Sequence, residues 1–178
     1  MITNKSDLTI SLPNGAHLDF GGVAKGWAAN QTMKRLKVFG PTLVSAGGDI
    51  AMSGQLLNGE PWLIGIEDPF KPGAYIETIS LASGGVATSG KDYRNWTKNG
   101  VKQHHVINPQ TGLPAETDIL TATVLAPTVL EAEAMAKAVL ISGSYAGLAW
   151  LNSCDNFSGM LILENGQLLG SRNFRNYL

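Results

Sequence analysis

A series of short apolar runs, each bounded by turn-forming residues, fills the middle of this sequence and most constrains its fold. Apolar runs of about four to eight residues between glycine, proline or asparagine are typical of β-strands. The predicted strands of this series are residues 43–46, 49–53, 62–67, 74–81, 86–89, 106–108 and 120–126. The Gly47-Gly48 pair predicts a turn between the first two. We therefore expect the middle of the chain to form a β-sheet.

Two hairpins and a helix are expected toward the ends of the chain. Residues 8–12 and 17–20 predict a hairpin around Asn14-Gly15, because this dipeptide favours a type I′ turn. A terminal hairpin is predicted from residues 160–163 and 168–170 around Asn165-Gly166. An apolar stripe predicts a helix over residues 23–39, which Gly40-Pro41 ends.

A second helix is expected to begin at Thr128. Thr128 and Glu131 have the spacing of a capping box, in which the threonine cap is worth about 1 kcal/mol. The apolar positions that would form its buried face are Ala132, Met135, Ala136 and Val139. Residues 144–151 predict a further short helix.

Composition limits the number of domains and the kinds of partner. A chain of 178 residues with 44% hydrophobic content can bury one substantial core, so we expect a single domain. With a net charge of −1, the chain lacks the excess of positive charge that is typical of proteins that bind nucleic acid or an anionic membrane. Cys154 is the only cysteine, which leaves oxygen or imidazole ligands for any metal. No segment approaches the roughly 18 apolar residues of a membrane span, so the sequence predicts none.

The segment 104–112 is the strongest indication of a functional site, with the sequence HHVINPQTG. A strand that ends in two imidazoles and turns at Asn-Pro and Thr-Gly places a titratable base beside backbone donors. Such donors can face a phosphate. The alternative interpretation is a strand end with a hydrogen-bonded structural histidine.

Three other segments place functional groups at strand ends. The segment DFGGVAKG at residues 19–26 puts a glycine pair and a lysine at a helix start, where N–H groups and positive potential suit a pyrophosphate. It fits neither the Walker nor the dinucleotide fingerprint, and a purely structural glycine-rich helix start is the alternative. The turn at residues 46–49 could approach a planar ligand or be a plain hairpin turn. Residues 87–90 offer hydroxyls, or are an ordinary strand end.

Taken in order, these segments resemble one family, the FAD:protein FMN transferases or ApbE-like proteins. The matching segments are LDFGGVAKG at 18–26, SAGGDI at 45–50, ATSG at 87–90, HVINPQTG at 105–112 and AEAMAKA at 132–138. The resemblance implies an α+β fold with a mixed sheet packed with helices, as one domain over residues 1–178. It also implies transfer of the FMN moiety of FAD to a Thr or Ser hydroxyl of a target flavoprotein, with release of AMP.

The resemblance further implies roles for individual residues. Its implied site consists of His105 as catalytic base, Asp19, Lys25, Asp49, Thr88 and Ile107 around FAD, and the Gly22 carbonyl and Glu133 at Mg²⁺. These roles make physical sense, because an alcohol attacks only after a base takes its proton. A pyrophosphate accepts that attack only when its charge is offset.

This sequence departs from the family pattern in two places. The family's N-terminal portion, which completes the FAD pocket, is lacking from residues 1–178. The family's metal-ligating Asp and Thr fall at Glu133 and Lys137, and a protonated lysine cannot ligate Mg²⁺. Either the ammonium replaces the metal as counter-charge to the pyrophosphate, or the metal site is lost. A plain surface ion pair, worth about 0.2–0.5 kcal/mol, is the remaining interpretation.

Two other functions stay open at this point. A non-catalytic flavin-binding or interaction module would keep the fold and the histidine loop, and an FAD pyrophosphatase would use water to give FMN and AMP. We expect FAD and a target flavoprotein as partners, and a second copy could cover exposed apolar surface. The first residues lack the apolar stretch of a signal peptide, so the chain as given would remain in the cytoplasm, although family members are often exported.

Overall fold

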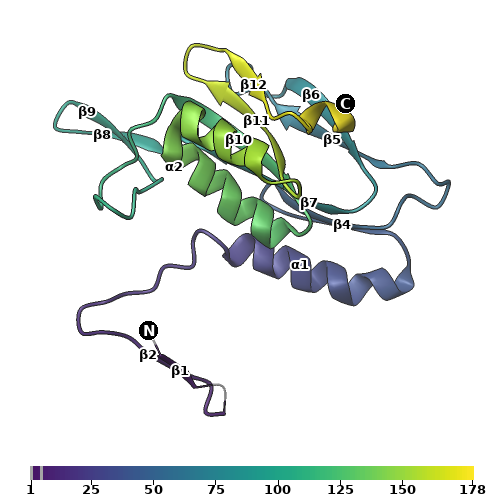
Figure 1. The fold of residues 1–178 in the computed structure, drawn as a ribbon, viewed down its shortest axis with the longest axis horizontal. Helices are drawn as coiled ribbons and strands as arrows, with labels where there is room; N and C mark the ends of the chain where they lie inside the picture. Colours follow the sequence, from purple (N-terminus) through teal and green to yellow (C-terminus); the bar gives the residue numbers. More distant parts are fainter. Residues whose placement is uncertain (1, 5) are drawn as a thin grey trace.

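A six-stranded antiparallel sheet forms the centre of the molecule in the order β12-β11-β10-β7-β4-β3 (Figure 1). The computed structural model describes residues 2–4 and 6–178, and Met1 and Lys5 lie outside the described residues. The strands of the sheet are β3 (Thr42–Ala46), β4 (Asp49–Ser53), β7 (Gly84–Gly90), β10 (Ile119–Ala126), β11 (Ser158–Leu163) and β12 (Leu168–Gly170). The strands predicted in these regions, including the terminal hairpin, are confirmed.

Two helices cover one face of this sheet. The first, α1 (Ala24–Leu36), continues as the 3₁₀ turn η1 (Lys37–Phe39), which confirms the helix predicted over residues 23–39. It ends at Gly40, whose φ of 137° lies in a region that favours glycine. The chain continues from η1 into β3 and β4, and α1 packs against these two strands at the β3 edge of the sheet (Figure 1).

The second helix, α2 (Val129–Ser153), begins at the predicted cap. The Thr128 hydroxyl oxygen accepts a hydrogen bond from the Glu131 N–H at 3.3 Å. The helix breaks at Gly143, where φ is 80° and ψ is 166°. The Asp118 carboxylate accepts the Ser144 N–H after this break at 2.9 Å. The short helix predicted over residues 144–151 is therefore the final part of α2.

Burial on α2 shows which face packs on the sheet. Ala132, Ala136 and Val139 are buried as predicted, and Met135 is half-buried. They pack with apolar side chains of β10 and β11 in the core on this face. By length and composition alone α2 could cross a membrane, although the sequence predicted no membrane span. Its buried side chains pack against the sheet.

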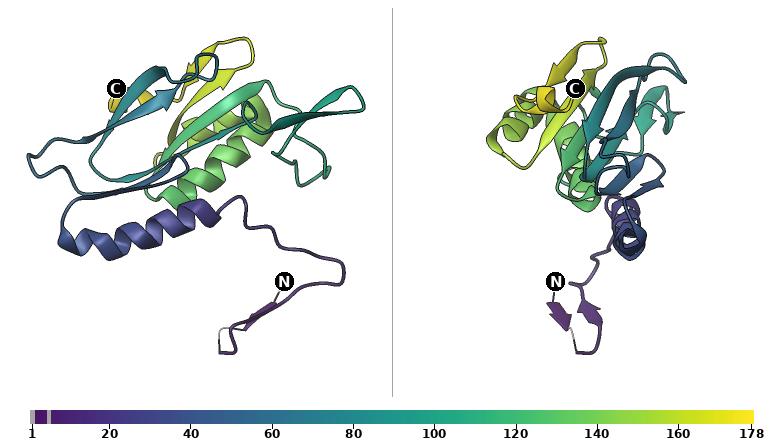
Figure 2. Two further views of the ribbon diagram at one scale, coloured as in Figure 1. Left: turned by 180° about the vertical axis from the view of Figure 1, so that it is seen from behind. Right: turned by 90° about the vertical axis from the view of Figure 1, so that its right-hand side faces the viewer.

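A hairpin covers the opposite face of the sheet. It consists of β5 (Trp62–Glu67) and β6 (Tyr75–Leu81), which confirms both predicted strands. Ile64 and Ile79 from the hairpin pack with Val86, Leu125 and Phe174, the last from the 3₁₀ turn η2 (Phe174–Tyr177). The molecule therefore has three layers, with helices and hairpin on opposite sides of the sheet (Figure 2).

The predicted N-terminal hairpin is wrong. Residues 17–20 form no strand, and β2 (Thr9–Ser11) pairs instead with β1 (Ile2–Asn4). Asn14-Gly15 does form a turn, closed by the Ala16 N–H donating to the Pro13 carbonyl at 3.0 Å. Residues 6–20 are exposed and lead away from the sheet (Figure 1), so no apolar face fixes a strand register there.

The strand predicted at residues 106–108 is also wrong. Only an isolated bridge between Ile107 and Pro114 forms there. The Asn108 carbonyl accepts the N–H groups of Thr111 and Gly112, which closes the chain into a turn and prevents a ladder. The strands in this region lie earlier, as β8 (Asn95–Lys98) and β9 (Val101–His104), which sequence reasoning missed.

Candidate active site

Asp19 shapes the start of α1. Its Oδ1 accepts the Gly21 N–H at 2.7 Å, and the Phe20 carbonyl accepts the N–H groups of Val23 and Ala24 at 3.0 and 2.9 Å. These bonds turn the chain directly into the helix. Asp19 is exposed, and this local turn is the contact that the structure gives it.

Glu133 joins the two helices from inside the protein. Its Oε2 accepts the Gly26 N–H of α1 at 2.8 Å, and the residue is 0% exposed. A Cβ on Gly26 would lie 2.8 Å from the Val129 carbonyl oxygen and 2.9 Å from Glu133 Oε2. Only glycine at this position therefore lets α1 approach closely enough for the bond.

Two ion pairs lie beside this helix contact, and we call Lys25, Asp49, Glu133 and Lys137 the paired-charge cluster. Lys137 Nζ lies 3.2 Å from Glu133 Oε1, and Lys25 Nζ lies 2.6 Å from Asp49 Oδ2. The lysine side chains are 26% and 47% exposed, whereas both carboxylate side chains are 1% exposed. The predicted Glu133–Lys137 pair exists, but its acidic partner is buried, so it is not a surface ion pair.

Asp49 connects the two pairs electrostatically. It opens β4 directly after Gly47 and Gly48, whose positive φ values of 61° and 90° form the predicted turn. Burial raises the pKa of Asp49, and the adjacent Lys25 acts in the opposite direction. Glu133 raises and Lys137 lowers the same pKa by smaller amounts, so the four charges form one electrostatic unit.

A cavity of about 520 Å³ lies between the start of α1, the loop after His105 and the surface of α2. Gly22 and Val23 line it from the turn before α1, Asn108, Pro109 and Gln110 from the loop, and Lys137, Ile141 and Ser142 from α2. Lys137 passes Gly22, because its Cδ would lie 3.5 Å from a Cβ placed there. The cavity thus brings together three segments that are far apart in the sequence.

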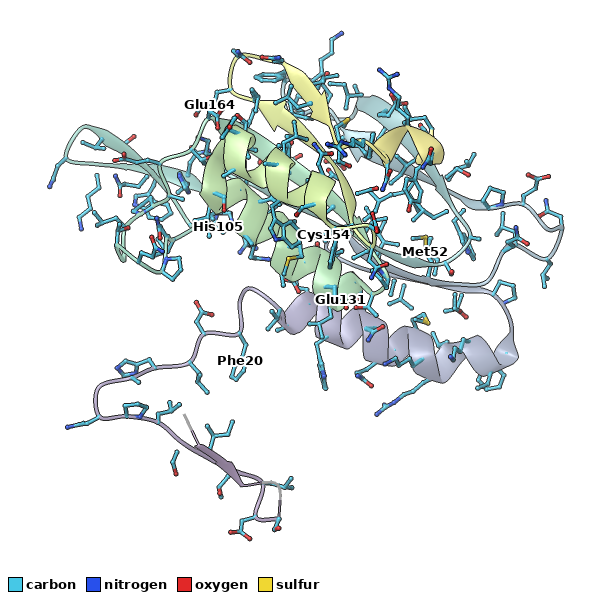
Figure 3. All side chains as sticks on the ribbon, viewed as in Figure 1. Phe20, Met52, His105, Glu131, Cys154 and Glu164 are labelled. Carbon is cyan, nitrogen blue, oxygen red and sulfur yellow. The ribbon has the colours of Figure 1, made fainter. Side chains whose placement is uncertain are left out.

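The two adjacent histidines have different environments. His105 is exposed, and its Nδ1 lies 3.3 Å from the Arg94 carbonyl oxygen. A carbonyl only accepts, so Nδ1 carries the hydrogen and Nε2 keeps the lone pair that a general base needs. Figure 3 places His105 on the chain between the β8–β9 hairpin and α2.

His104 has a structural environment. Its Nε2 donates to the Ala115 carbonyl at 3.1 Å, and burial lowers the pKa of its imidazole. Its buried Nδ1 has no hydrogen-bond partner among the residues that the structure describes. These contacts fit the structural interpretation of the pair for His104, whereas the role of His105 as a base stays a prediction.

Thr88 and Ile107 lie apart from the paired-charge cluster. Thr88 hydrogen-bonds through its hydroxyl to Thr123 at 2.9 Å, on the sheet face that also carries Val86 and Leu125. Asp49 lies on the other face, because residues alternate along β4 and Ala51 packs against the helices. Ile107 is 44% exposed in the loop.

Two titratable groups near the histidines lie outside the predicted site. Lys91 is buried, and its ammonium contacts the Thr117 carbonyl and, at 2.8 Å, Glu164 Oε1. Burial raises the pKa of Asp92, and hydrogen bonds from the backbone of Asp92 and Tyr93 act in the opposite direction. The partners of Lys91 come from distant parts of the chain, so no local motif marks this residue.

The residues present do not fit the Mg²⁺ site implied by the family pattern. Both oxygens of Glu133 are engaged, one by the Gly26 N–H and the other by Lys137. Across residues 2–4 and 6–178, no group of three or more His, Cys, Asp or Glu side chains is arranged to hold a metal. Lysine at position 137 adds a positive charge where a cation would have to bind.

Comparison with known proteins decides the family. The sequence profile of the ApbE family matches residues 2–161. The chain belongs to the ApbE family. This ApbE-family chain is 35% identical over 148 residues to the FAD:protein FMN transferase of Haemophilus influenzae, covering 79% of this chain and 42% of that protein. It is 35% identical over 131 residues to the enzyme of the same name from Escherichia coli K12, covering 71% of this chain and 37% of that protein.

Solved structures show the same fold. The ApbE protein of Thermotoga maritima superposes with a TM-score of 0.88 at 29% identity, covering 99% of this chain and 58% of that one. The flavin transferase ApbE of Vibrio cholerae gives a TM-score of 0.76 at 26% identity, covering 91% of this chain and 53% of that one. The expected α+β fold of helices packed on a sheet is confirmed, although the six-stranded sheet is antiparallel throughout and not mixed. The chain spans about two fifths of the curated relatives' length.

Proposed function

We propose that this ApbE-family chain binds FAD and transfers its FMN moiety to a Thr or Ser hydroxyl of a target flavoprotein, releasing AMP. The observation that carries the proposal is the cavity between Gly22, Lys137 and the loop after His105. Lys137 and the loop residues Asn108 and Gln110 line it, and this loop begins three residues after His105, which supports the proposal. The relatives named FAD:protein FMN transferase support the same reaction.

His105 supplies the proton transfer in this proposal. Its Nε2 takes the proton of the acceptor hydroxyl, and the hydroxyl oxygen then forms a bond to the phosphorus on the FMN side of the pyrophosphate. The bond between that phosphorus and the bridging oxygen breaks, and AMP leaves with the bridging oxygen. A positioned base of this kind contributes about 10²–10⁴-fold in rate.

The remaining site residues act on charge and position. Lys25 and Lys137 are exposed enough to reach an anion, and their buried carboxylate partners hold both side chains in place. Asp19 fixes the turn that presents Gly22 to the cavity. Positive groups held in advance lower the cost of the charge that develops on the pyrophosphate during attack.

The experiment is a product analysis after incubation of the protein with FAD, Mg²⁺ and a threonine-containing acceptor peptide. The proposal predicts AMP together with a peptide whose mass increases by one phosphoriboflavin group. AMP with free FMN and unmodified peptide would instead show a pyrophosphatase. Binding of FAD without AMP formation would show a non-catalytic flavin-binding module.

A further inference from the structure

We propose that the Lys137 ammonium binds the pyrophosphate of FAD directly and makes binding independent of a divalent cation. The inference rests on the proposed function for the identity of the ligand. It follows from the contacts of Glu133 and Lys137, from the direction in which both ion pairs point, and from the shape of the cavity beside Gly22.

Both oxygens of Glu133 already have a protein partner. Oε2 accepts the Gly26 N–H at 2.8 Å and Oε1 lies 3.2 Å from Lys137 Nζ. A metal ion at Oε1 would lie against the ammonium and be repelled by it, and one at Oε2 would compete with the bond that joins α1 to α2. Because Glu133 is fully buried, loss of its bond to the backbone would leave the Gly26 N–H unpaired inside the protein.

Both ion pairs present their positive ends to the outside. The carboxylate side chains of Asp49 and Glu133 are 1% exposed, whereas those of Lys25 and Lys137 are 47% and 26% exposed. The cluster is neutral in sum, but an arriving anion meets ammonium groups before it meets carboxylates. A divalent cation meets the same ammonium groups and is repelled.

Lys137 retains the capacity to bind a ligand. A lysine ammonium has three N–H donors. Among the described residues its partner is Glu133, which leaves the other donors for a phosphate oxygen. The carboxylate holds the otherwise flexible side chain over the cavity, so little additional ordering is needed when the ligand binds.

The cavity beside Lys137 contains a few polar groups that could contact a diphosphate, within a lining that is otherwise mostly apolar. Asn108 and Gln110 supply these groups from the loop and Ser142 from α2. Gly22 leaves room for the passing lysine, whose Cδ would be 3.5 Å from a Cβ at that position. The volume of about 520 Å³ is within the roughly 300–1,000 Å³ of small-molecule sites.

The test is calorimetric titration of the whole chain with ADP, which carries the pyrophosphate without the flavin. The native protein should bind ADP with similar affinity in EDTA and in Mg²⁺. Lys137→Met keeps the apolar stem but removes the charge, and should weaken binding in EDTA about 10-fold or more, as expected for a lost charge-assisted hydrogen bond. Lys137→Arg should retain most of the affinity in EDTA.

Two further variants make the test specific. Lys137→Thr offers a hydroxyl ligand and should make ADP binding depend on Mg²⁺. Lys34→Thr is the matched control, because Lys34 is exposed elsewhere on α1 and its loss should leave ADP affinity unchanged. Thermal melts of every variant establish that each is folded before titration.

Several results would overturn the proposal. Loss of native ADP binding in EDTA, or equal affinity of Lys137→Met and native protein in EDTA, would show that the ammonium does not hold the ligand. Mg²⁺-dependent ADP binding would leave the proposed transferase function standing without this inference. Metal-independent ADP binding without any reaction of FAD would support the role of Lys137 and contradict the transferase function. No ADP binding under either condition would contradict both proposals.

Discussion

Replacing Gly26 with alanine tests the contact that holds α1 against α2. The added Cβ would lie 2.8 Å from the Val129 carbonyl oxygen and 2.9 Å from Glu133 Oε2, so the helices must separate and weaken the Gly26–Glu133 bond. Overpacking costs about 1–3 kcal/mol and a lost bond to a charged group about 1.5–3 kcal/mol. Alanine has a higher helix propensity than glycine, which offsets this loss of stability by about 1 kcal/mol. Gly26→Ala should therefore lower the free energy of unfolding by about 1.5–5 kcal/mol.

Urea denaturation followed by circular dichroism measures this change, and the melting temperature should fall by roughly 3–20 °C. Thr32→Ala is the matched control, because Thr32 is exposed on the same helix and gains helix propensity without a clash. It should be neutral or slightly stabilising. A Gly26→Ala protein as stable as the native one would refute the close helix contact and the buried role of Glu133.

Two further predictions concern stability. Burial lowers the pKa of His104, so the native state resists its protonation and the protein should lose stability as pH falls below about 6.5. His104→Gln can still donate to Ala115, and in this variant the loss of stability at low pH should be reduced. The control His17→Gln changes an exposed histidine and should follow the native protein. Urea midpoints measured from pH 7.5 to 5 that fall in parallel for all three proteins would contradict this prediction. Thr128→Ala should cost about 1 kcal/mol of unfolding free energy and Thr128→Ser little, and equal urea midpoints for the two variants would exclude the cap.

Local patterns predicted those elements whose side chains are fixed by the core. The strands of the sheet and both helices follow apolar periodicity, because one face of each packs on a neighbour. The N-terminal hairpin failed because nothing covers residues 6–20 and so no face determines the register. The strands β8 and β9 were missed for a related reason, since Trp96 and Val101 are 49% and 59% exposed there. Their signal was the Asn99-Gly100 turn, with φ values of 51° and 77°.

The site shows the same division between local and distant causes. The glycine-rich start of α1 and the histidine loop were predicted because their chemistry is contained in short segments. The burial of Glu133 was not predicted, because the spacing of Glu133 and Lys137 is the same on an exposed helix face as on a buried one. What decides it is the N–H of Gly26, which is 107 positions away in the sequence. Lys91 is anchored in the same way, by Thr117 and Glu164.

The rate of AMP release from FAD in the presence of an acceptor peptide, compared between His105→Ala and His104→Gln, tests the central claim most directly. His105 has the free Nε2 and His104 is held by Ala115, so His105→Ala should lower the rate about 100-fold or more while FAD affinity changes little. His104→Gln should remain within a few-fold of the native rate. The opposite ranking, with His104→Gln inactive and His105→Ala near the native rate, would contradict the assignment of His105 as the base.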